Sequence, residues 1–524
     1  MSGSPPASAP WKPRFNPYLI AASVMLATFM EVLDTSVANV ALPHIAGSLA
    51  ASSDQAIWVL TSYLVANAVV LPMTGWLGQR FGRKRFLTGC VLLFTLASAL
   101  CGAAGSLAAL ILARVMQGAA GGALQPMSQA IMLESFPPEK RAQGMSIFAM
   151  GVVVAPILGP TLGGWITDNY SWRWVFYINV PVGILAAWMI TMFVEDPPYL
   201  KREAGPVDYT GFAFLTIWLA TLQYILDRGQ ELDWLGSDAI VWCMVISGAS
   251  LIAFLVRELT AKSPLVDLRL FRMRNFSVGC FLVAVLGALL YGTTAILPLF
   301  MQTLLGYDAT NAGIALSPRG AAAFVAALIA GRLMGLVGGR ALIVAGFAIM
   351  TISLWLFGNI DLNIGMREML VPILLAGLAI TLIFVPLSVV TMGGLRPEQT
   401  GNATGIYNLV RNLGGSFGIS LLQTCITRES QKTQGTLVGH FTPLNPAYRD
   451  YLADAQSYLS LHNHVADAAR QAQQVAYNLL QQQAASLAYA DLFQMLTIFS
   501  LVCTFFVFLL RKVSIKPGAA AAAH

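Results

Sequence analysis

Apolar runs of about 20 residues recur along the whole chain, and short polar loops separate them. A run of this length crosses the hydrocarbon core of a bilayer as a helix, because each residue advances an α-helix by about 1.5 Å. The pattern therefore predicts an all-α membrane protein with fourteen transmembrane helices. They are expected at 17–41, 55–77, 86–104, 107–133, 142–166, 174–194, 209–226, 238–257, 276–301, 311–336, 341–358, 368–393, 402–426 and 489–511.

Composition and charge agree with this assignment. Of the 524 residues, 56% are hydrophobic and only 11% are charged, against roughly 25% charged in a soluble domain. With a cytoplasmic N-terminus, most of the 31 Lys and Arg residues fall in cytoplasmic loops, which is the usual bias of membrane proteins. The net charge of +6 then orients the chain and does not indicate nucleic acid. We expect a multi-pass protein with both termini in the cytoplasm.

The two halves of the chain resemble each other. A Pro-Glu pair opens the fifth predicted helix at Pro138 and the thirteenth at Pro397, and the same spacing carries Gly159 onto Gly418. The loop after the second helix also has a degenerate copy after the tenth. Two six-helix halves related in this way form a parallel repeat, as in several transporters. The seventh and eighth helices have no counterpart, so we interpret them as an insertion.

These patterns predict the division of the chain. A cytoplasmic tail is expected at 1–16, an N-terminal six-helix bundle at 17–200, two inserted linker helices at 201–260, a C-terminal six-helix bundle at 261–512 that includes a periplasmic loop or helix at 427–488, and a cytoplasmic tail at 513–524.

Four motifs follow one another at the expected helices: 32–43 in the first helix, 75–84 after the second, 110–122 in the fourth and 155–164 in the fifth. Together they resemble the signatures of the major facilitator superfamily, and within it the fourteen-helix drug:proton antiporters of the EmrB type. The resemblance covers essentially the whole chain. It implies a major facilitator fold of two six-helix bundles plus two inserted helices. It also implies a proton-driven multidrug efflux antiporter of the bacterial inner membrane, which confers antibiotic resistance.

Three ionisable residues inside predicted helices are candidates for proton coupling. Glu31 and Asp34 lie three residues apart and project from one face of the first helix, and Arg114 is the only basic residue inside a predicted helix of the first half. Each such group costs about 2.5–3.5 kcal/mol at the centre of a helix. A carboxylate that alternately pairs with Arg114 and faces a desolvated cavity would bind and release a proton. We expect Asp34 to be this proton carrier, with Glu31 as the next candidate. A static ion pair between the two helices is the structural alternative.

Polar residues in otherwise apolar helices are candidates for substrate binding, because such groups usually face the bundle interior or a water-filled cavity. The expected substrates are hydrophobic or amphipathic compounds. Arg319 and Arg411 would give the second half a positive wall, which favours anionic or weakly acidic amphiphiles over plain cations. The other candidates are Asn67, Gln125, Tyr291 and Asn408. Hydrogen bonding between helices is their alternative role.

A further set concerns conformational change. In the fifth helix, glycines allow another helix to approach closely and prolines bend the backbone, which the resemblance interprets as a hinge. These residues are Pro156, Gly159, Pro160, Gly163 and Gly164. After the second helix, the candidate gate residues are Gly75, Arg80, Gly82 and Arg83. The family usually has an aspartate where this chain has Gln79, so we expect a weaker acid–base latch.

The resemblance also implies partners, namely a periplasmic adaptor (membrane fusion) protein and a TolC-type outer-membrane channel that complete a tripartite pump. The hydrophilic stretch 427–488 is where an adaptor would dock. Apolar residues recur there at helical spacing, from Val465 through Ala472 to Leu479. The same stripe could instead pack on the transporter itself.

Other functional classes fit less well. The chain has no Gly-Lys pair and hence no phosphate-binding loop of an ATP-driven pump, so we expect no cofactor and a proton gradient as the energy source. The six cysteines lie inside apolar runs without a CxxC pair, so neither disulfides nor a metal site are expected. Scattered acids argue for a secondary active transporter over a membrane enzyme. A proton-coupled importer, or a lipid or metabolite exporter of the same fold acting alone, is the remaining alternative.

Overall fold

The computed structural model describes residues 12–198, 208–261, 264–360, 362, 364–460 and 465–511. Helices make up most of these residues, and none of them lies in a strand. Most of the two predicted tails, and residues 201–207 at the start of the predicted insertion, lie outside the described residues.

The first half contains six spans, some of them broken into shorter helices. The spans are α1 (Pro17–Ser48), α3 with η1 and α4 (Trp58–Val70, Leu71–Met73, Thr74–Phe81), α5 (Arg83–Ala103), α6 with α7 (Leu107–Gly121, Leu124–Ser135), α8 (Arg141–Asn169) and α9 with α10 (Trp174–Tyr177, Asn179–Phe193). A short helix, α2 (Ser53–Ala56), follows α1.

The inserted pair and the second half follow. The inserted helices are α11 (Tyr209–Arg228) and α12 (Asp238–Thr260), and the second half contains α13 (Arg274–Thr303), α14 (Ala309–Val337), α15 (Gly339–Phe357), α16 (Met366–Thr391), α17 (Thr400–Val438), α18 (Pro446–Ser460) and α19 (Val465–Phe506).

Every predicted transmembrane helix is present in the structure. Among the described residues, twelve helices are long and apolar enough to cross a membrane, and the bent α8 makes a thirteenth. The remaining predicted span is α17, which carries Asn408 and Arg411 in its first half. It packs along α13, where Gly414 lies against Ala284 and Gly418 against Ala288. The polarity of α17 therefore belongs to a helix buried inside the bundle.

The two halves close on each other at one end of the bundle with matching contacts. Gly75 of α4 touches Asn402 of α17, while Gly331 of α14 touches Gln143 of α8. A side chain at Gly75 would overlap Asn402, and one at Gly331 would be in tight contact with Gln143. The equivalent turns before α5 and α15 also match, since Gly82 and Gly338 have φ angles of +83° and +86°. Such angles favour glycine, which explains the repeated loop in the sequence.

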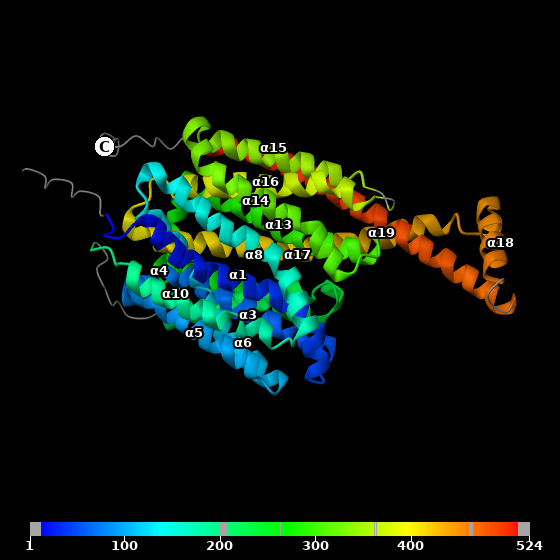
Figure 1. The fold of residues 1–524 in the computed structure, drawn as a ribbon, viewed down its shortest axis with the longest axis horizontal. Coiled ribbons are helices and arrows are strands. Elements are labelled where there is room, and N and C mark those ends of the chain that lie inside the picture. The colour runs from blue at the N-terminus through cyan, green and yellow to red at the C-terminus, as the bar shows by residue number, and fades with distance from the viewer. Residues whose placement is uncertain are drawn as a thin grey trace, which may run out of the picture.

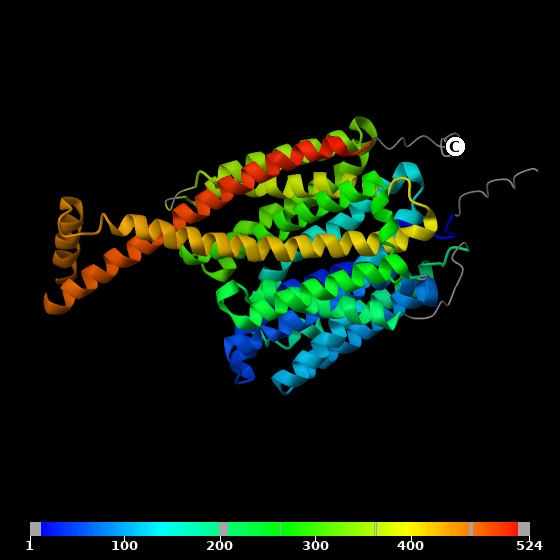
Figure 2. The same ribbon diagram turned by 180° about the vertical axis from the view of Figure 1, so that it is seen from behind.

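A helical hairpin projects from the opposite end. We call residues 427–488 the projecting hairpin, comprising the end of α17, all of α18 and the first part of α19. Figures 1 and 2 show it extending well beyond the other helices, with α18 lying across its tip, while α1 begins and α19 ends at the far end of the bundle. We refer to these two ends as the hairpin end and the terminus end.

Part of the apolar stripe predicted in this region is buried inside the projecting hairpin. Ala472 and Ala476 are buried, and α19 packs against both α17 and α18. Val475 is 43% exposed on another side of the helix. The side chain of Val465 lies outside the described residues. Part of the stripe thus stabilises the hairpin, and the remainder faces outward.

Candidate functional site

A cavity of about 600 Å³ lies between the two halves. Its walls come from α1, α3, α7, α8, α13, α14 and α17, with Gln223 added from α11. Of the candidates for proton coupling and substrate binding, five line it: Glu31, Asn67, Gln125, Tyr291 and Arg319. The cavity extends to Pro43 and Gln302, which lie near the hairpin-end termini of α1 and α13.

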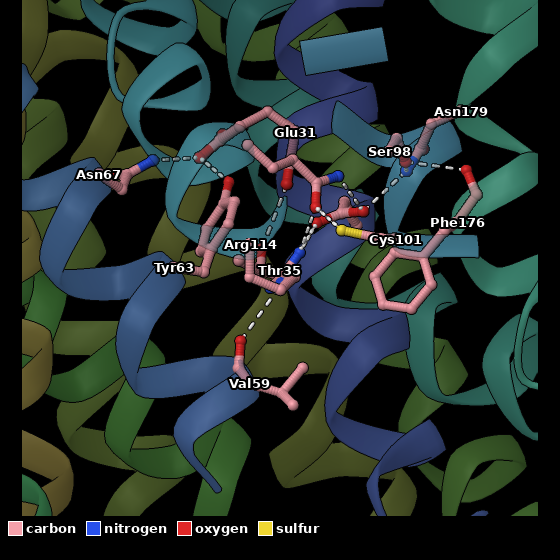
Figure 3. Close-up of polar contacts among 12 residues, drawn as sticks. Glu31, Thr35, Val59, Tyr63, Asn67, Ser98, Cys101, Arg114, Phe176 and Asn179 are labelled. Atoms are coloured by element: carbon pink, nitrogen blue, oxygen red, sulfur yellow. Dashed lines mark hydrogen bonds and ion pairs between the residues drawn. The ribbon is translucent and has the colours of Figure 1, made fainter. Parts of the chain in front are cut away.

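Glu31 contributes the carboxylate of this cavity. The Tyr63 hydroxyl and the Asn67 amide donate to Glu31 Oε1 at 3.2 and 3.1 Å. The Gln125 amide donates to Oε2 at 2.5 Å. Figure 3 shows Tyr63 and Asn67 pointing toward Glu31 from the neighbouring helix. No hydrogen bond or ion pair among the described residues joins Glu31 directly to a cationic side chain.

Gln125 connects Glu31 to the other half. Its side-chain oxygen accepts a hydrogen bond from Nη2 of Arg411 on α17, while its amide group donates to Glu31. Close by, Asn408 donates to Gln129 Oε1 at 2.6 Å, again across the two halves. Asn408 and Arg411 are buried and do not line the cavity. The structure places these two candidates at the interface between the halves.

Asp34 lies one turn further along α1 in a different environment. Its Oδ2 pairs with Nη1 of Arg114 at 2.6 Å, and both side chains are fully buried. Its Oδ1 accepts hydrogen bonds from the amides of Gln117 and Asn179, at 2.8 and 2.7 Å. Asp34 is thus enclosed within the first half by α1, α6 and α10, and it does not line the cavity.

Arg114 makes several contacts besides its ion pair with Asp34. Nε donates to the backbone oxygen of Val59 at 3.1 Å, and Nη1 also reaches Gln117. The guanidinium carbon lies 4.1 Å from the centre of the Tyr63 ring, a separation at which cation–π attraction is favourable. Since Tyr63 also donates to Glu31, it contacts both ionisable sites, as Figure 3 shows.

Sequence reasoning missed three of these polar residues. Gln117 lies three residues after Arg114, so helical spacing placed it on the same face and could have flagged it. Asn179 opens α10, and Tyr63 lies in α3, and neither has a local signal that points to the first helix. Only the packing of distant helices brings them to α1.

Arg319 provides the cation of the cavity. It is only 2% exposed, and its guanidinium nitrogens donate to the hydroxyls of Thr293 and Thr294 at 2.9 and 3.1 Å. Its Nε has no hydrogen-bond partner among the described residues. No carboxylate pairs with Arg319 in the part of the chain that the structure describes. The cavity therefore has an acid on one wall and an uncompensated cation on the opposite half.

The hinge candidates of α8 lie against α1. The Ser36 hydroxyl donates to the backbone oxygen of Pro156 at 3.0 Å. Gly159 packs on Ser36, Gly163 on Val37 and Gly164 near Val40. The axis of α8 turns by 42° between Pro138–Pro156 and Leu158–Asn169, as expected where prolines interrupt the backbone hydrogen bonds. Pro160 lies in the same stretch and lines the cavity.

The gate candidates lie at the terminus end. Gln79 donates to the backbone oxygen of Glu398 in the other half at 3.0 Å. Gln79, which stands where the family usually has an aspartate, thus makes a neutral hydrogen bond across the two halves. Arg83 is buried and pairs with Glu134 of α7, while Arg80 lies over the ring of Trp76.

The inserted helix α11 connects the two halves near the hairpin end. Asp227 accepts hydrogen bonds from Thr61 of α3 and from Gln223, each at 2.9 Å. Gln223 in turn accepts one from Ser416 of α17 at 3.2 Å. These contacts were not predicted, since the sequence gives no signal for the partner of an inserted helix.

A family model for the Major Facilitator Superfamily matches residues 24–419. The chain belongs to the Major Facilitator Superfamily. It is 39% identical over 437 residues to "Multidrug export protein EmrB" of Haemophilus influenzae, covering 83% of this chain and 85% of that protein. It is 37% identical over 439 residues to "Fatty acid resistance protein FarB" of Neisseria gonorrhoeae, covering 83% and 85%.

The fold is also that of this superfamily. The crystal structure of the human organic anion transporter MFSD10 (TETRAN) matches with a TM-score of 0.60 at 15% identity, covering 94% of this chain and 100% of that one. The family model and the similarity to EmrB relatives confirm the family resemblance that the four motifs carried.

Proposed function

We propose that this EmrB-type transporter exports amphipathic compounds in exchange for protons. The observation that carries the proposal is the chain from Glu31 through Gln125 to Arg411, because it joins a cavity-facing carboxylate to the opposite half by hydrogen bonds. A change in the protonation of Glu31 then changes a contact that holds the two halves together.

The cavity reaches the hairpin end, while Gly75 and Gly331 close the terminus end. We assign this arrangement to the outward-facing state, with the hairpin in the periplasm and both termini in the cytoplasm of a bacterium. In this state Glu31 is reached by protons from outside. A protonated Glu31 no longer offers two charged oxygens, so the hydrogen bond from Gln125 weakens and Arg411 loses its fixed partner. The halves are then free to rock toward the inward-facing state.

Asp34 has a second role in this scheme. In this state Arg114, Gln117 and Asn179 enclose it. A shift of α1 against α6 exposes it, and the proton passes between the two acids of α1. One charge crossing 100 mV supplies about 2.3 kcal/mol, whereas a tenfold gradient of a neutral substrate requires about 1.4 kcal/mol. A single proton therefore suffices for useful export.

We further propose that weakly acidic amphiphiles are among the substrates. Arg319 has hydroxyl partners and no carboxylate among the described residues, so an anionic head group can pair with it. The apolar residues Val32, Val40 and Leu316 offer the same cavity a surface for an alkyl or aromatic tail. The FarB relative is named for fatty acid resistance, which agrees with this substrate class.

We propose that the projecting hairpin docks a periplasmic adaptor, which leads to a TolC-type channel. Leu444, Tyr458 and Val475 are exposed on the hairpin, at 91%, 65% and 43%. Tyrosine is among the residues that provide most of the binding energy of protein interfaces, and neighbouring apolar side chains exclude water around it.

The coupling proposal is tested by proton release from the purified protein in weakly buffered detergent solution. Adding substrate to the wild type releases protons, recorded with a pH-sensitive dye. Glu31→Gln keeps the shape of the side chain but cannot ionise, so it should abolish most of the release while substrate still binds. Glu429→Gln, a change in the projecting hairpin, serves as the control. Proton release by Glu31→Gln equal to that of the wild type would refute the role of Glu31.

A further inference from the structure

A second and larger cavity lies on the side of the molecule, between the inserted helices and the second half. Its volume is about 1110 Å³, and its walls come from α11, α12, α13, α17 and α19. Ordinary ligand pockets measure about 300–1,000 Å³, so this groove is large for a single drug-sized molecule. Its lining includes neither Glu31 nor Asp34, nor the residues that donate hydrogen bonds to these two carboxylates.

The walls of this groove are almost entirely apolar. They include Leu222 and Met244 of the inserted pair, Ala288 of α13, Leu421 of α17 and Phe499 of α19. All five belong to membrane-spanning helices, and Leu421 and Phe499 are 58% and 42% exposed. In a bilayer, an open apolar surface at this depth is in contact with acyl chains.

One end of the groove differs from the rest. Arg428 is the charged residue of the lining, and it lies just beyond the predicted membrane span of α17. Among the described residues, it makes no hydrogen bond or ion pair. Trp234, in the turn that follows α11, lines the same groove. Tryptophan and arginine together are typical of the membrane interface, where lipid head groups lie.

We propose that this groove binds one anionic, two-chain phospholipid from the leaflet at the hairpin end. Its acyl chains lie between α11, α12 and the second half, and its phosphate pairs with Arg428. Charge complementarity selects an anionic head group, because a basic residue beside an apolar groove attracts acidic lipids. The size of the groove favours two acyl chains over one.

The bound lipid contributes to the wall of the transport site. Leu413 lines both the groove and the central cavity, so the two are neighbours at this residue. Of the inserted helices, α11 contacts α17 of the second half over part of its length. In the proposal, the lipid fills the space that remains between the inserted helices and the second half. This assignment does not rest on the proposed direction or energy source of transport.

Native mass spectrometry of the purified full-length protein tests the proposal without measuring transport. The protein is stripped of lipid and titrated separately with phosphatidylglycerol, phosphatidylcholine and dodecanoate. The wild type should retain one phosphatidylglycerol most tightly. Arg428→Gln should weaken that binding about fivefold, as expected for one basic residue near a lipid phosphate. It should weaken phosphatidylcholine binding less, because the choline group offsets the charge of the phosphate. Arg470→Gln, a change on the exposed surface of α19, should have no effect.

A second variant tests the position of the acyl chains. Met244→Trp adds bulk inside the groove and should reduce binding of both phospholipids, while Val245→Trp, on the exposed side of the same helix, should not. If Met244→Trp does not fold, the Arg428→Gln comparison still decides. Equal phosphatidylglycerol binding by Arg428→Gln and wild type, unchanged binding by a folded Met244→Trp, or a preference for dodecanoate over both phospholipids would each overturn the proposal.

Discussion

Two carboxylates of α1 lie within one helical turn and have opposite surroundings. Glu31 faces the central cavity and accepts hydrogen bonds from neutral donors, whereas Asp34 is enclosed with the buried cation of Arg114. The sequence correctly marked both as intramembrane acids, and it favoured Asp34 as the proton carrier. The structure gives direct access from the cavity to Glu31. That difference depends on which helices pack against each side of α1, which helical spacing alone does not reveal.

The Asp34–Arg114 pair should also stabilise the first half. Removing one partner of a buried ion pair leaves an uncompensated charge, which costs about 3–5 kcal/mol. Asp34→Asn should therefore lower the free energy of unfolding by roughly 3 kcal/mol, measured by denaturant titration in mixed micelles. The double variant Asp34→Asn/Arg114→Gln should recover much of that loss without recovering transport. If Asp34→Asn is as stable as the wild type, Asp34 does not carry a charge in the folded protein.

Arg319 should set the preference for acidic substrates. Arg319→Gln removes the charge but keeps hydrogen-bonding groups beside Thr293 and Thr294. Efflux of decanoate should fall about tenfold, since a hydrogen bond to a charged group contributes about 1.5–3 kcal/mol. Efflux of a cationic dye should change less than twofold. Arg367→Gln, at the exposed start of α16, is the matched control, and equal losses for both substrates would assign Arg319 a structural role.

At the scale of elements, the terminus end is closed by glycines that occupy equivalent positions in the two halves. Gly75 lies against Asn402 and Gly331 against Gln143. A side chain at Gly75 would overlap Asn402, and one at Gly331 would be in tight contact with Gln143. In the proposed mechanism, this contact is the closed gate, and it opens when the two halves rock.

Gly75→Val should prevent this closure and hold the transporter in the inward-facing state. Its measurable effect is higher reactivity of a single cysteine placed in the central cavity toward a thiol reagent added from the cytoplasmic side. Gly89→Val in α5 provides the control, since the space around Gly89 is open. Equal cysteine reactivity in wild type and Gly75→Val would contradict the assignment of this contact as the gate.

At the scale of the whole molecule, we propose that transport and docking belong to different parts. The projecting hairpin extends away from the helix bundle (Figures 1 and 2). Replacing residues 439–464 by a short Gly/Ser linker removes α18 and the tip. This change should abolish drug resistance in whole cells and leave transport by the purified protein in liposomes unchanged. Unaltered cellular resistance would exclude the tip as a docking surface.

The sequence predicted the number and positions of the helices because membrane-spanning helices need long apolar runs. It also identified Glu31, Asn67 and Gln125, since polar groups at that depth are few. It could not predict that Gln125 joins Arg411, because that contact spans 286 positions and depends on the packing of both halves. The hairpin was only partly predicted, since α17 and α19 continue as helices well past the apolar segments that define a span.

Gradient-driven accumulation in liposomes tests the central claim most directly. The purified protein is reconstituted into liposomes with an acidic lumen and supplied with a permanently charged cationic dye, which cannot follow a pH difference by itself. For a one-to-one exchange of dye and proton, a difference of one pH unit should support about tenfold accumulation in the lumen. Nigericin, which collapses the difference, and Glu31→Gln should each abolish it. Equal accumulation with and without the pH difference would contradict proton-driven antiport.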